Sequence, residues 1–403
     1  MTLAAVVGHF REEHRDFLTG FITLLISVIL SFVSGVYLGS VTDALILIPG
    51  LMMLVTPSIN MRGAIAGILT SRLSSAMHLG TFEPKFGKDT ELGDNIRSSL
   101  ILTVVISAVL SIFGKLVAMA TGTEVISMLE MIVITVISGA VAGLIVTAVG
   151  VGMSVLCYRR QWDLDMIGAP TVTTVGDMVT LPILVISALL IMQLPFLGKL
   201  ILGAVVLVMI VISLVAFKRG TRTMKDVLKE GLPLLIPLSL LGIIAGLLYT
   251  NRLESLISAA AILILISPFM NGCGSIGGIL TSRVGTEMHM GLVDPKIIPQ
   301  KVVWGHFLEN YIYALIILPI MAVLTHFAAV LFDIATPGLV PILLITLLAG
   351  IIVITVMNIL GYLTAVVTYR IGFDPDNFGV PVVTSSIDLV GASALLLVMA
   401  LIL

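Results

Sequence analysis

Two aspartates lie in apolar stretches of the sequence, where a charged side chain is costly. Asp177 and Asp388 each follow a proline by seven residues, and each proline opens a long apolar run. A carboxylate at the centre of a membrane-spanning helix costs about 2.5–3.5 kcal/mol on the insertion scale, so its presence in two runs requires a reason. Two carboxylates brought close together repel each other, and a divalent cation relieves that repulsion. We therefore interpret Asp177 and Asp388 as metal ligands; the alternative is that hydroxyls such as those of Thr173 and Thr384 hold them as packing residues.

A second group of candidates offers neutral oxygen atoms and exposed backbone. Each member follows Pro57 or Pro268 at the same spacing, and the group comprises Asn60, Gly63 and Gly67 with Asn271, Gly274 and Gly278. Glycines at these spacings either line a pore or let helices pack tightly. Oxygen ligands without a Cys/His cluster favour Mg²⁺ or Ca²⁺, and Mg²⁺ keeps several of its waters. The pattern predicts a polar pore for a hydrated Mg²⁺ ion.

Three further charged residues accompany these motifs. Arg62 lies among the pore candidates, where it would repel cations unless an acid neutralises it, so we expect a salt-bridge or coupling role for it. Asp43 and Glu254 begin apolar runs. They either attract cations to the outer mouth of the pore or cap a helix.

The composition requires that lipid, rather than water, solvates most of the chain. Of the 403 residues, 58% are hydrophobic and only 11% are charged, against about 25% in ordinary soluble domains. The net charge of -2 gives no sign of a nucleic-acid partner. These values exclude a secreted domain, a nucleic-acid binder and a cytosolic enzyme, and the expected partners are membrane lipid and divalent cations.

Eleven apolar runs are long enough to cross a membrane. They cover residues 17–39, 42–75, 97–120, 126–157, 170–194, 199–217, 232–250, 255–286, 301–328, 337–369 and 381–403. The second and eighth runs contain Pro57 and Pro268, so we expect broken or kinked helices there. With a cytoplasmic N-terminus, 17 of the 21 Lys and Arg residues lie on the cytoplasmic side and 3 outside. This asymmetry predicts a cytoplasmic N-terminus and an extracellular C-terminus in the plasma membrane.

The two motifs recur with a constant offset of 211 residues. The stretch from Pro57 to Arg72 returns from Pro268 to Arg283, and the stretch at 163–177 returns at 374–388. The repeated unit contains five spans. Because five is odd, two units joined directly would have opposite orientations in the membrane. The extra helix near 199–217 restores the direction, so we predict two parallel repeats related by a pseudo-twofold axis along the membrane normal. The expected domains are a first repeat at 1–195, a linker helix and cytoplasmic loop at 196–228, and a second repeat at 229–403.

These motifs resemble those of the MgtE / solute carrier family 41 magnesium transporters. The resemblance rests on Pro-x-x-Asn-x-x-Gly-x-x-x-Gly followed by Ser-Arg, and on Gly-x-Pro-x-x-Thr-x-x-x-Asp, each present twice. It implies an all-α polytopic fold and Mg²⁺ as the transported ion. It also implies that Asp177 and Asp388 are the central Mg²⁺ ligands, with Asn60 and Asn271 in the same pore.

The resemblance is to the fused, two-repeat form of that family. Bacterial members resemble homodimers of five-span units that carry cytoplasmic N and CBS domains, and we expect neither domain here. The fused form implies that a monomer contains a complete pore.

The expected function is therefore a divalent cation transporter or channel and not an enzyme. A Na⁺- or H⁺-coupled Mg²⁺ exchanger is the first alternative. An intramembrane aspartyl protease is a remote one, because its Gly-x-Gly-Asp signature is absent from Thr174–Asp177 and from Ser385–Asp388.

Overall fold

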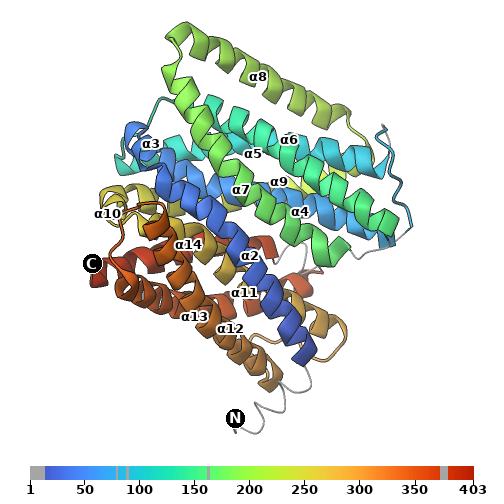
Figure 1. Cartoon of the computed structure of the whole chain (residues 1–403). Coiled ribbons are helices and arrows are strands. Elements are labelled where there is room, and N and C mark those ends of the chain that lie inside the picture. The colour runs from blue at the N-terminus through green and yellow to red at the C-terminus, as the bar shows by residue number, and fades with distance from the viewer. Residues whose placement is uncertain (1–13, 79, 88–89, 161–163, 373–379) are drawn as a thin grey trace. The chain divides into compact units, whose positions relative to one another are not determined.

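The computed structural model describes residues 14–78, 80–87, 90–160, 164–372 and 380–403. Within those ranges every regular element is a helix and no strand occurs. Ten of the helices described there are long and apolar enough to cross a membrane, and a shorter apolar helix covers Leu24–Ser40. The prediction of an all-α polytopic membrane protein with about eleven spans is confirmed (Figure 1).

The helices follow one another with short connections. In chain order they are α2 (His14–Ser40), α3 (Thr42–Leu47), α4 (Leu51–His78), α5 (Glu91–Thr121), α6 (Met128–Arg160), α7 (Leu164–Gln193), α8 (Phe196–Arg219), α9 (Arg222–Thr250), α10 (Leu253–Ser258), α11 (Ala261–His289), α12 (Lys301–Leu331), α13 (Leu339–Ile371) and α14 (Val380–Ile402). The N-terminal residues before His14, and Asp163, Asp374 and Asp376 of the second motif, lie outside the described residues.

The helix boundaries repeat the 211-residue offset of the sequence. α10 begins and ends 211 residues after α3, and α13 begins and ends 211 residues after α6. Left-handed residues recur at the same offset: Gly80 and Gly291 have φ of 70° and 72°, and Gly122 and Asp333 have φ of 70° and 54°. Aspartate tolerates this conformation better than most residues, so it replaces glycine at the end of α12. α8 alone has no counterpart among the described helices, as expected for the linker helix.

The turns that follow α4 and α11 are also alike. In each turn the amide of a lysine donates to the carbonyl of an acidic residue two positions earlier, at 2.7 Å for Lys85 and Glu83 and again for Lys296 and Asp294. The two side chains of each pair also form an ion pair of 2.8 Å. The hydrogen bond from the lysine, with its charge, lowers the pKa of Glu83 and of Asp294. These exposed pairs contribute little stability, so their recurrence reflects the duplication.

The chain forms two compact units that exchange one helix of each repeat. One unit, the α2 unit, contains residues 1–40 and 254–403, and the other, the α9 unit, contains residues 41–253. α2 packs against α11 and α12, whereas its repeat equivalent α9 packs against α4 and α5. The compact units therefore cut across the sequence boundaries at 195 and 229, because the first helix of each repeat packs with the other helices of the opposite repeat.

Proline and glycine explain how the exchanged helices approach so closely. Pro57 and Pro268 lie inside α4 and α11, where each lacks the N–H that would bind the carbonyl four residues earlier. Those two carbonyls belong to Met53 and Ile264. Gly246 of α9 faces the Met53 carbonyl, and Gly35 of α2 faces the Ile264 carbonyl. A Cβ added to these glycines would lie only 2.2 Å and 2.1 Å, respectively, from the carbonyl oxygen. Each carbonyl freed by a proline thus meets a glycine of the exchanged helix, again at the 211-residue offset.

The predicted breaks occur ahead of the prolines rather than at them. The apolar run at 42–75 is divided into α3 and α4, and the run at 255–286 into α10 and α11. Gly50 adopts φ of 81° at the first break, where a Cβ would lie 2.5 Å from Val125. Only glycine fits this left-handed position without strain.

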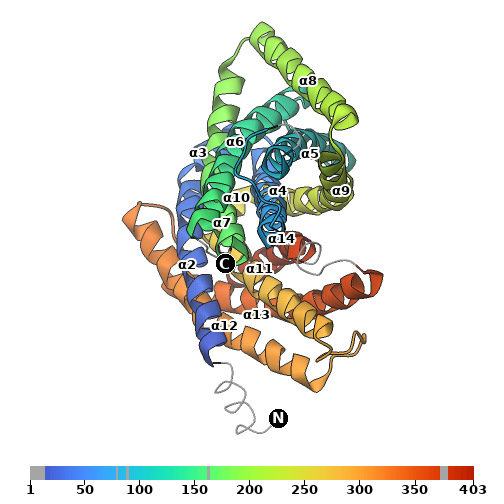
Figure 2. The ribbon, with the colours of Figure 1, turned by 90° about the vertical axis from the view of Figure 1, so that its right-hand side faces the viewer.

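α4 and α11 form the centres of their respective units. In their most apolar windows 72% and 78% of the residues are buried, against 11% in α8. α4 contacts α5, α6, α7 and α9, and α11 contacts α2, α12, α13 and α14. α8 lies along the outer side of α6 (Figures 1 and 2). These two helices carry the repeated asparagine–glycine motif, which is Asn60, Gly63 and Gly67 on α4 and Asn271, Gly274 and Gly278 on α11. The helices with this motif are therefore the most enclosed of those described.

Candidate functional site

In the α9 unit, the two repeated motifs meet between α4 and α7. Asp177 lies on α7 and is 5% exposed. A Cβ on Gly63 would lie 3.3 Å from Cγ2 of Thr173, and a Cβ on Gly176 would lie 3.8 Å from the backbone nitrogen of Gly63. Glycine at both positions lets the helix backbones approach beside the aspartate. Asn60 lies one turn before Gly63 and is partly exposed.

The α2 unit repeats this arrangement between α11 and α14. Asp388 lies on α14 and is 1% exposed. A Cβ on Gly274 would lie 3.3 Å from Cγ2 of Ile387 and 3.9 Å from Cγ2 of Thr384. Within each unit the fold therefore brings a buried aspartate next to the asparagine–glycine motif of the same repeat.

The amide of Asn271 is held by hydroxyl groups. Ser27 Oγ donates to Asn271 Oδ1 at 2.9 Å, and Ser275 Oγ donates to the same oxygen at 3.3 Å. Ser27 lies on the exchanged helix α2, so the sequence motifs did not identify it. Its signal is a polar residue within an apolar helix that also carries Ser31 and Ser34.

The second glycines of the motif differ from the first in their surroundings. A Cβ on Gly67 would meet no atom within 4 Å, and the residue is partly exposed. Close helix packing therefore does not explain this glycine. Gly278, its equivalent on α11, is buried.

Arg62 occupies a buried pocket between α4, α5 and α6. It is 3% exposed, and its Nη2 donates to Ser107 Oγ at 2.7 Å. Gly139 and Gly143 of α6 make room for the guanidinium, because Cβ atoms there would lie 2.5 Å from Nη2 and 3.4 Å from Nη1. Among the described residues its Nε and Nη1 have no hydrogen-bond partner, and Arg62 forms no ion pair there. Of the two expected roles, the salt bridge is therefore not seen in that part of the chain, and a coupling role stays a prediction.

The second repeat replaces this pocket with apolar residues. The equivalents of Arg62 and its neighbours, at the 211-residue offset, are Cys273 for Arg62, Ala314 for Thr103, Leu318 for Ser107, Gly350 for Gly139 and Ile354 for Gly143. A buried guanidinium needs polar neighbours, and the second repeat lacks both the arginine and those neighbours. Arg62 is thus built into one repeat only.

The two outer acids lie at helix starts. Asp43 is exposed in the first turn of α3, and Glu254 is exposed in the first turn of α10. Carboxylates at these positions interact favourably with the positive end of the helix dipole. Their helix-start position is therefore as expected, and attraction of cations stays a prediction.

Any metal held here must take much of its coordination from water, amides or backbone. Among the described residues, no group of three or more His, Cys, Asp or Glu side chains is placed to hold a metal ion. Mg²⁺ commonly keeps several waters and uses only one or two carboxylates. One aspartate with asparagine and carbonyl oxygens, as each unit offers, suits that ion.

Comparison with solved structures gives one weak likeness. The crystal structure of the eukaryotic MATE transporter AtDTX14 aligns over 97% of this chain and 96% of its own, with 14% sequence identity and a TM-score of 0.36. A score of that size does not establish a shared fold. No curated protein sequence matches the chain.

The sequence profile of the MgtE family, described as divalent cation transporter, gives a decisive match. It matches residues 55–187 and again residues 266–398, which together make up more than half of the chain. Each matched region contains one asparagine–glycine motif and one of the two motif aspartates, Asp177 or Asp388. The two regions are again offset by 211 residues. The chain is a two-repeat member of the MgtE family of divalent cation transporters.

Proposed function

We propose that this protein moves Mg²⁺ across the membrane along a pathway between the two repeats, with Asp177 and Asp388 as the principal ligands. One observation supports this proposal above the others. In each family-matched region a buried aspartate on a membrane-spanning helix lies beside the asparagine–glycine motif of the same unit. A carboxylate buried in a membrane-spanning helix is costly, and a bound cation would offset that cost in both copies.

The ligand set selects the ion by charge and by hydration. Two carboxylates supply the net negative charge that a divalent cation needs, and Asn60 and Asn271 add neutral amide oxygens. Because few protein ligands are available, the ion keeps part of its water shell, as Mg²⁺ prefers. Softer metals are disfavoured by the lack of thiolate and imidazole ligands.

Transport is channel-like, down the electrochemical gradient, or is exchange against Na⁺ or H⁺. The N-terminus is cytoplasmic and the C-terminus extracellular, because the Lys and Arg residues concentrate in the loops on one side. The membrane is the plasma membrane. A single chain supplies both repeats, so a monomer is sufficient for transport.

Flux into proteoliposomes tests this function. Wild-type protein is expected to carry Mg²⁺, and a double variant with Asp177→Asn and Asp388→Asn is expected to lose that flux. Asparagine preserves the size of the side chain, so the loss reports the charges. A variant with Glu83→Gln and Asp294→Asn is the matched control, because it also removes one acid from each repeat, at exposed turns, but leaves the buried pair.

A Na⁺ gradient applied across the same vesicles separates the two modes of transport. Flux that depends on the gradient indicates exchange, and flux without it indicates a channel. Unchanged flux in a well-folded Asp177→Asn, Asp388→Asn variant would show that the two aspartates are structural.

A further inference from the structure

The α2 unit contains a second charged cluster, which the proposed ion pathway does not use. Arg283 and Glu287 lie near the end of α11, and His306 and Glu309 lie near the start of α12. We call these four residues the His306 cluster. The side chains of His306 and Glu309 are each 2% exposed, and that of Glu287 is 13% exposed. These are buried titratable groups within a membrane protein.

The cluster is a continuous network of polar contacts. His306 Nε2 lies 2.8 Å and 3.1 Å from the two carboxylate oxygens of Glu287. Its other ring nitrogen, Nδ1, lies 3.7 Å from Glu309 Oε2 and 3.5 Å from Arg283 Nη1. Arg283 Nη1 also donates to Glu309 Oε2. The Nδ1 atom thus faces an acceptor and a donor at similar distances.

This geometry suits both protonation states of the histidine. A neutral ring donates from Nε2 to Glu287 and accepts at Nδ1 from Arg283. A protonated ring still donates from Nε2 to Glu287, and its Nδ1 faces Glu309 of the same helix at 3.7 Å. The proton therefore turns the contact between His306 of α12 and Glu287 of α11 into a charge-assisted hydrogen bond, which is stronger than the neutral one.

Charge balance favours the protonated state. Two carboxylates and one guanidinium leave a net charge of −1 when His306 is neutral, and a proton on His306 brings the total to zero. Uncompensated charge is expensive to bury, whereas a balanced and hydrogen-bonded cluster is not. With a neutral His306, the four residues of the cluster therefore carry one uncompensated negative charge.

The first repeat has no such cluster. At the 211-residue offset Glu287, His306 and Glu309 correspond to Ala76, Asn95 and Ser98. The equivalent of Arg283 is Arg72, which forms a 2.7 Å ion pair with Glu230 of α9 instead. The start of α5 also buries an acid, Asp94, which pairs with Arg97 at 3.3 Å. Helix anchoring in the first repeat thus uses arginines and acids without a histidine, so the buried histidine of the second repeat requires another explanation.

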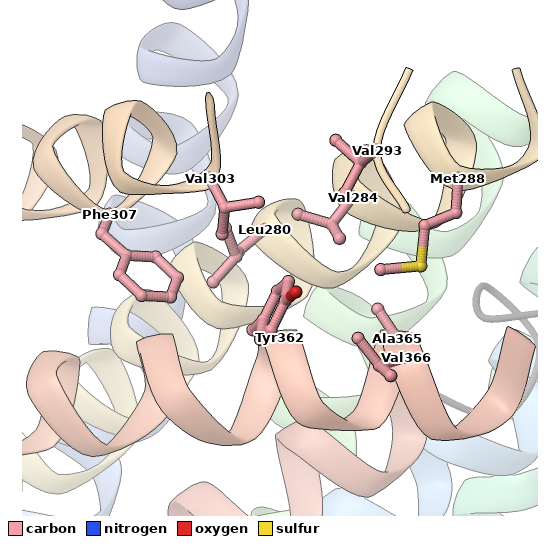
Figure 3. Close-up of a cluster of buried hydrophobic side chains, with 9 residues drawn as sticks. All are labelled: Leu280, Val284, Met288, Val293, Val303, Phe307, Tyr362, Ala365 and Val366. Carbon is pink, nitrogen blue, oxygen red and sulfur yellow. The ribbon is translucent and has the colours of Figure 1, made fainter. Parts of the chain in front are cut away.

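The cluster lies where three helices are firmly packed. Figure 3 shows Val284 and Met288 of α11 against Tyr362 and Ala365 of α13, with Val303 of α12 beside them. Asn310 Nδ2 donates to Asn358 Oδ1 at 2.7 Å, which joins α12 to α13 a turn further along. The ends of α11 and α12 that carry the cluster are therefore both packed against α13.

Other charged and titratable groups surround these helices. On α13, Tyr362 donates to the Lys296 carbonyl at 2.6 Å and Arg370 donates to the Pro295 carbonyl at 2.8 Å. Tyr369, also on α13, has its ring centre 4.9 Å from that of His289 on α11. The other described groups on the packed elements include Asp294 and Lys296 in the α11–α12 turn, Lys301, Tyr311, Tyr313 and His326 on α12, Cys273 on α11, Asp388 on α14 and Tyr37 on α2.

We propose that the His306 cluster is a proton-binding site whose occupancy controls the rate of Mg²⁺ transport. The control acts through α11, the helix that also carries Asn271 and Gly274. The protonated cluster ties α11 to α12 and slows transport, and loss of the proton leaves a buried negative charge that loosens this contact. The effect on transport rests on the proposed function, whereas proton binding by the cluster does not depend on it.

Two measurements test the proposal. The first is the ¹⁵N chemical shift of the histidine ring nitrogens in purified full-length protein, with His306→Asn used to assign the signal. We expect His306 to be doubly protonated at neutral pH, where an ordinary histidine is mostly neutral. A neutral His306 ring at that pH would overturn the proposal whatever the transport assay shows.

The second measurement is Mg²⁺ flux into proteoliposomes between about pH 6 and pH 9, a range that extends above the ordinary titration of histidine. Wild-type flux is expected to rise several-fold with pH. His306→Asn, which places the residue of position 95 in the second repeat, is expected to remove this rise. In Glu287→Gln the cluster is neutral when His306 is unprotonated. The rise of Mg²⁺ flux with pH should therefore occur at lower pH in this variant.

His289→Asn is the matched control, because His289 lies on α11 outside the cluster and its Nδ1 donates to the Gly285 carbonyl of its own helix, 2.9 Å away. It should keep the wild-type pH response. A pH response that is retained in His306→Asn, or absent from the wild type, would overturn the link to transport. Loss of all flux in the wild type at every pH would refute the proposed function, whereas the chemical-shift result would still decide the proton site.

Discussion

At the scale of single residues, the two repeats differ most in where they bury charge. Arg62 and its polar pocket occur in the first repeat only, and the His306 cluster occurs in the second only. The sequence marks Arg62 as unusual, because its repeat equivalent is Cys273. It does not reveal the partners of Arg62, since Ser107 and Gly139 come from other helices and are brought near by packing. For the same reason the sequence left a salt-bridge or a coupling role open for Arg62, and the structure gives it a hydroxyl partner, Ser107.

The charge of Arg62 is expected to weaken cation binding at the neighbouring aspartate. The Arg62 Cβ lies 3.7 Å from a Cβ built on Gly176, the residue before Asp177. Charges interact strongly across a poorly solvated interior. Arg62→Gln should therefore raise the apparent affinity of transport for Mg²⁺ several-fold, measured as the concentration dependence of flux in proteoliposomes.

Arg62→Lys is the control for that change, because it keeps the charge while altering the hydrogen bonds. It should retain an affinity close to that of the wild type. Equal affinities for Arg62→Gln and the wild type would show that the guanidinium does not act on the ion.

At the scale of helices, composition predicted the number of spans but not their partners. Hydrophobic runs identify membrane helices because lipid selects for apolar side chains, and this selection holds for every lipid-facing helix alike. Which helices touch is decided by small residues and local backbone, so the exchange of α2 and α9 was not evident from the sequence. In hindsight its signal is the recurrence of Gly35 and Gly246 at the repeat offset, each paired with a carbonyl freed by a proline.

Substitution at these two glycines is expected to destabilise the packed units. A methyl group on Gly35 or Gly246 would overlap the carbonyl of Ile264 or Met53, so the helices must separate, at a cost of about 1–3 kcal/mol. Thermal unfolding of the detergent-solubilised protein should show Gly35→Ala and Gly246→Ala unfolding at lower temperature than the wild type.

Gly152→Ala provides the comparison, because a Cβ at this exposed position of α6 meets no atom within 4 Å. It should leave the unfolding temperature unchanged or raise it slightly, since alanine favours the helix. Wild-type stability in both Gly35→Ala and Gly246→Ala would contradict the close carbonyl contact.

At the scale of the whole molecule, the constant offset made the architecture predictable. The motifs, the boundaries of two helix pairs, two pairs of left-handed residues and the family-matched regions all differ by 211 residues. The repeat and the family were therefore accessible from sequence, whereas the role of each buried acid depends on what surrounds it in space. Asp177 and Asp388 were identified because a carboxylate is costly in an apolar run. Glu287 and Glu309 were missed because they lie near helix ends, where charge is common.

The central claim is that one Mg²⁺ pathway uses an aspartate from each repeat. The most direct test is Mg²⁺ flux into proteoliposomes for Asp177→Asn, for Asp388→Asn and for both together. If the two carboxylates hold the same ion, each single variant should lower flux by at least about tenfold, which corresponds to about 1.4 kcal/mol, and the double variant should add less than the product of the two. Two single variants that each keep about half of the wild-type flux, with none in the double variant, would instead indicate two independent pathways and contradict the claim.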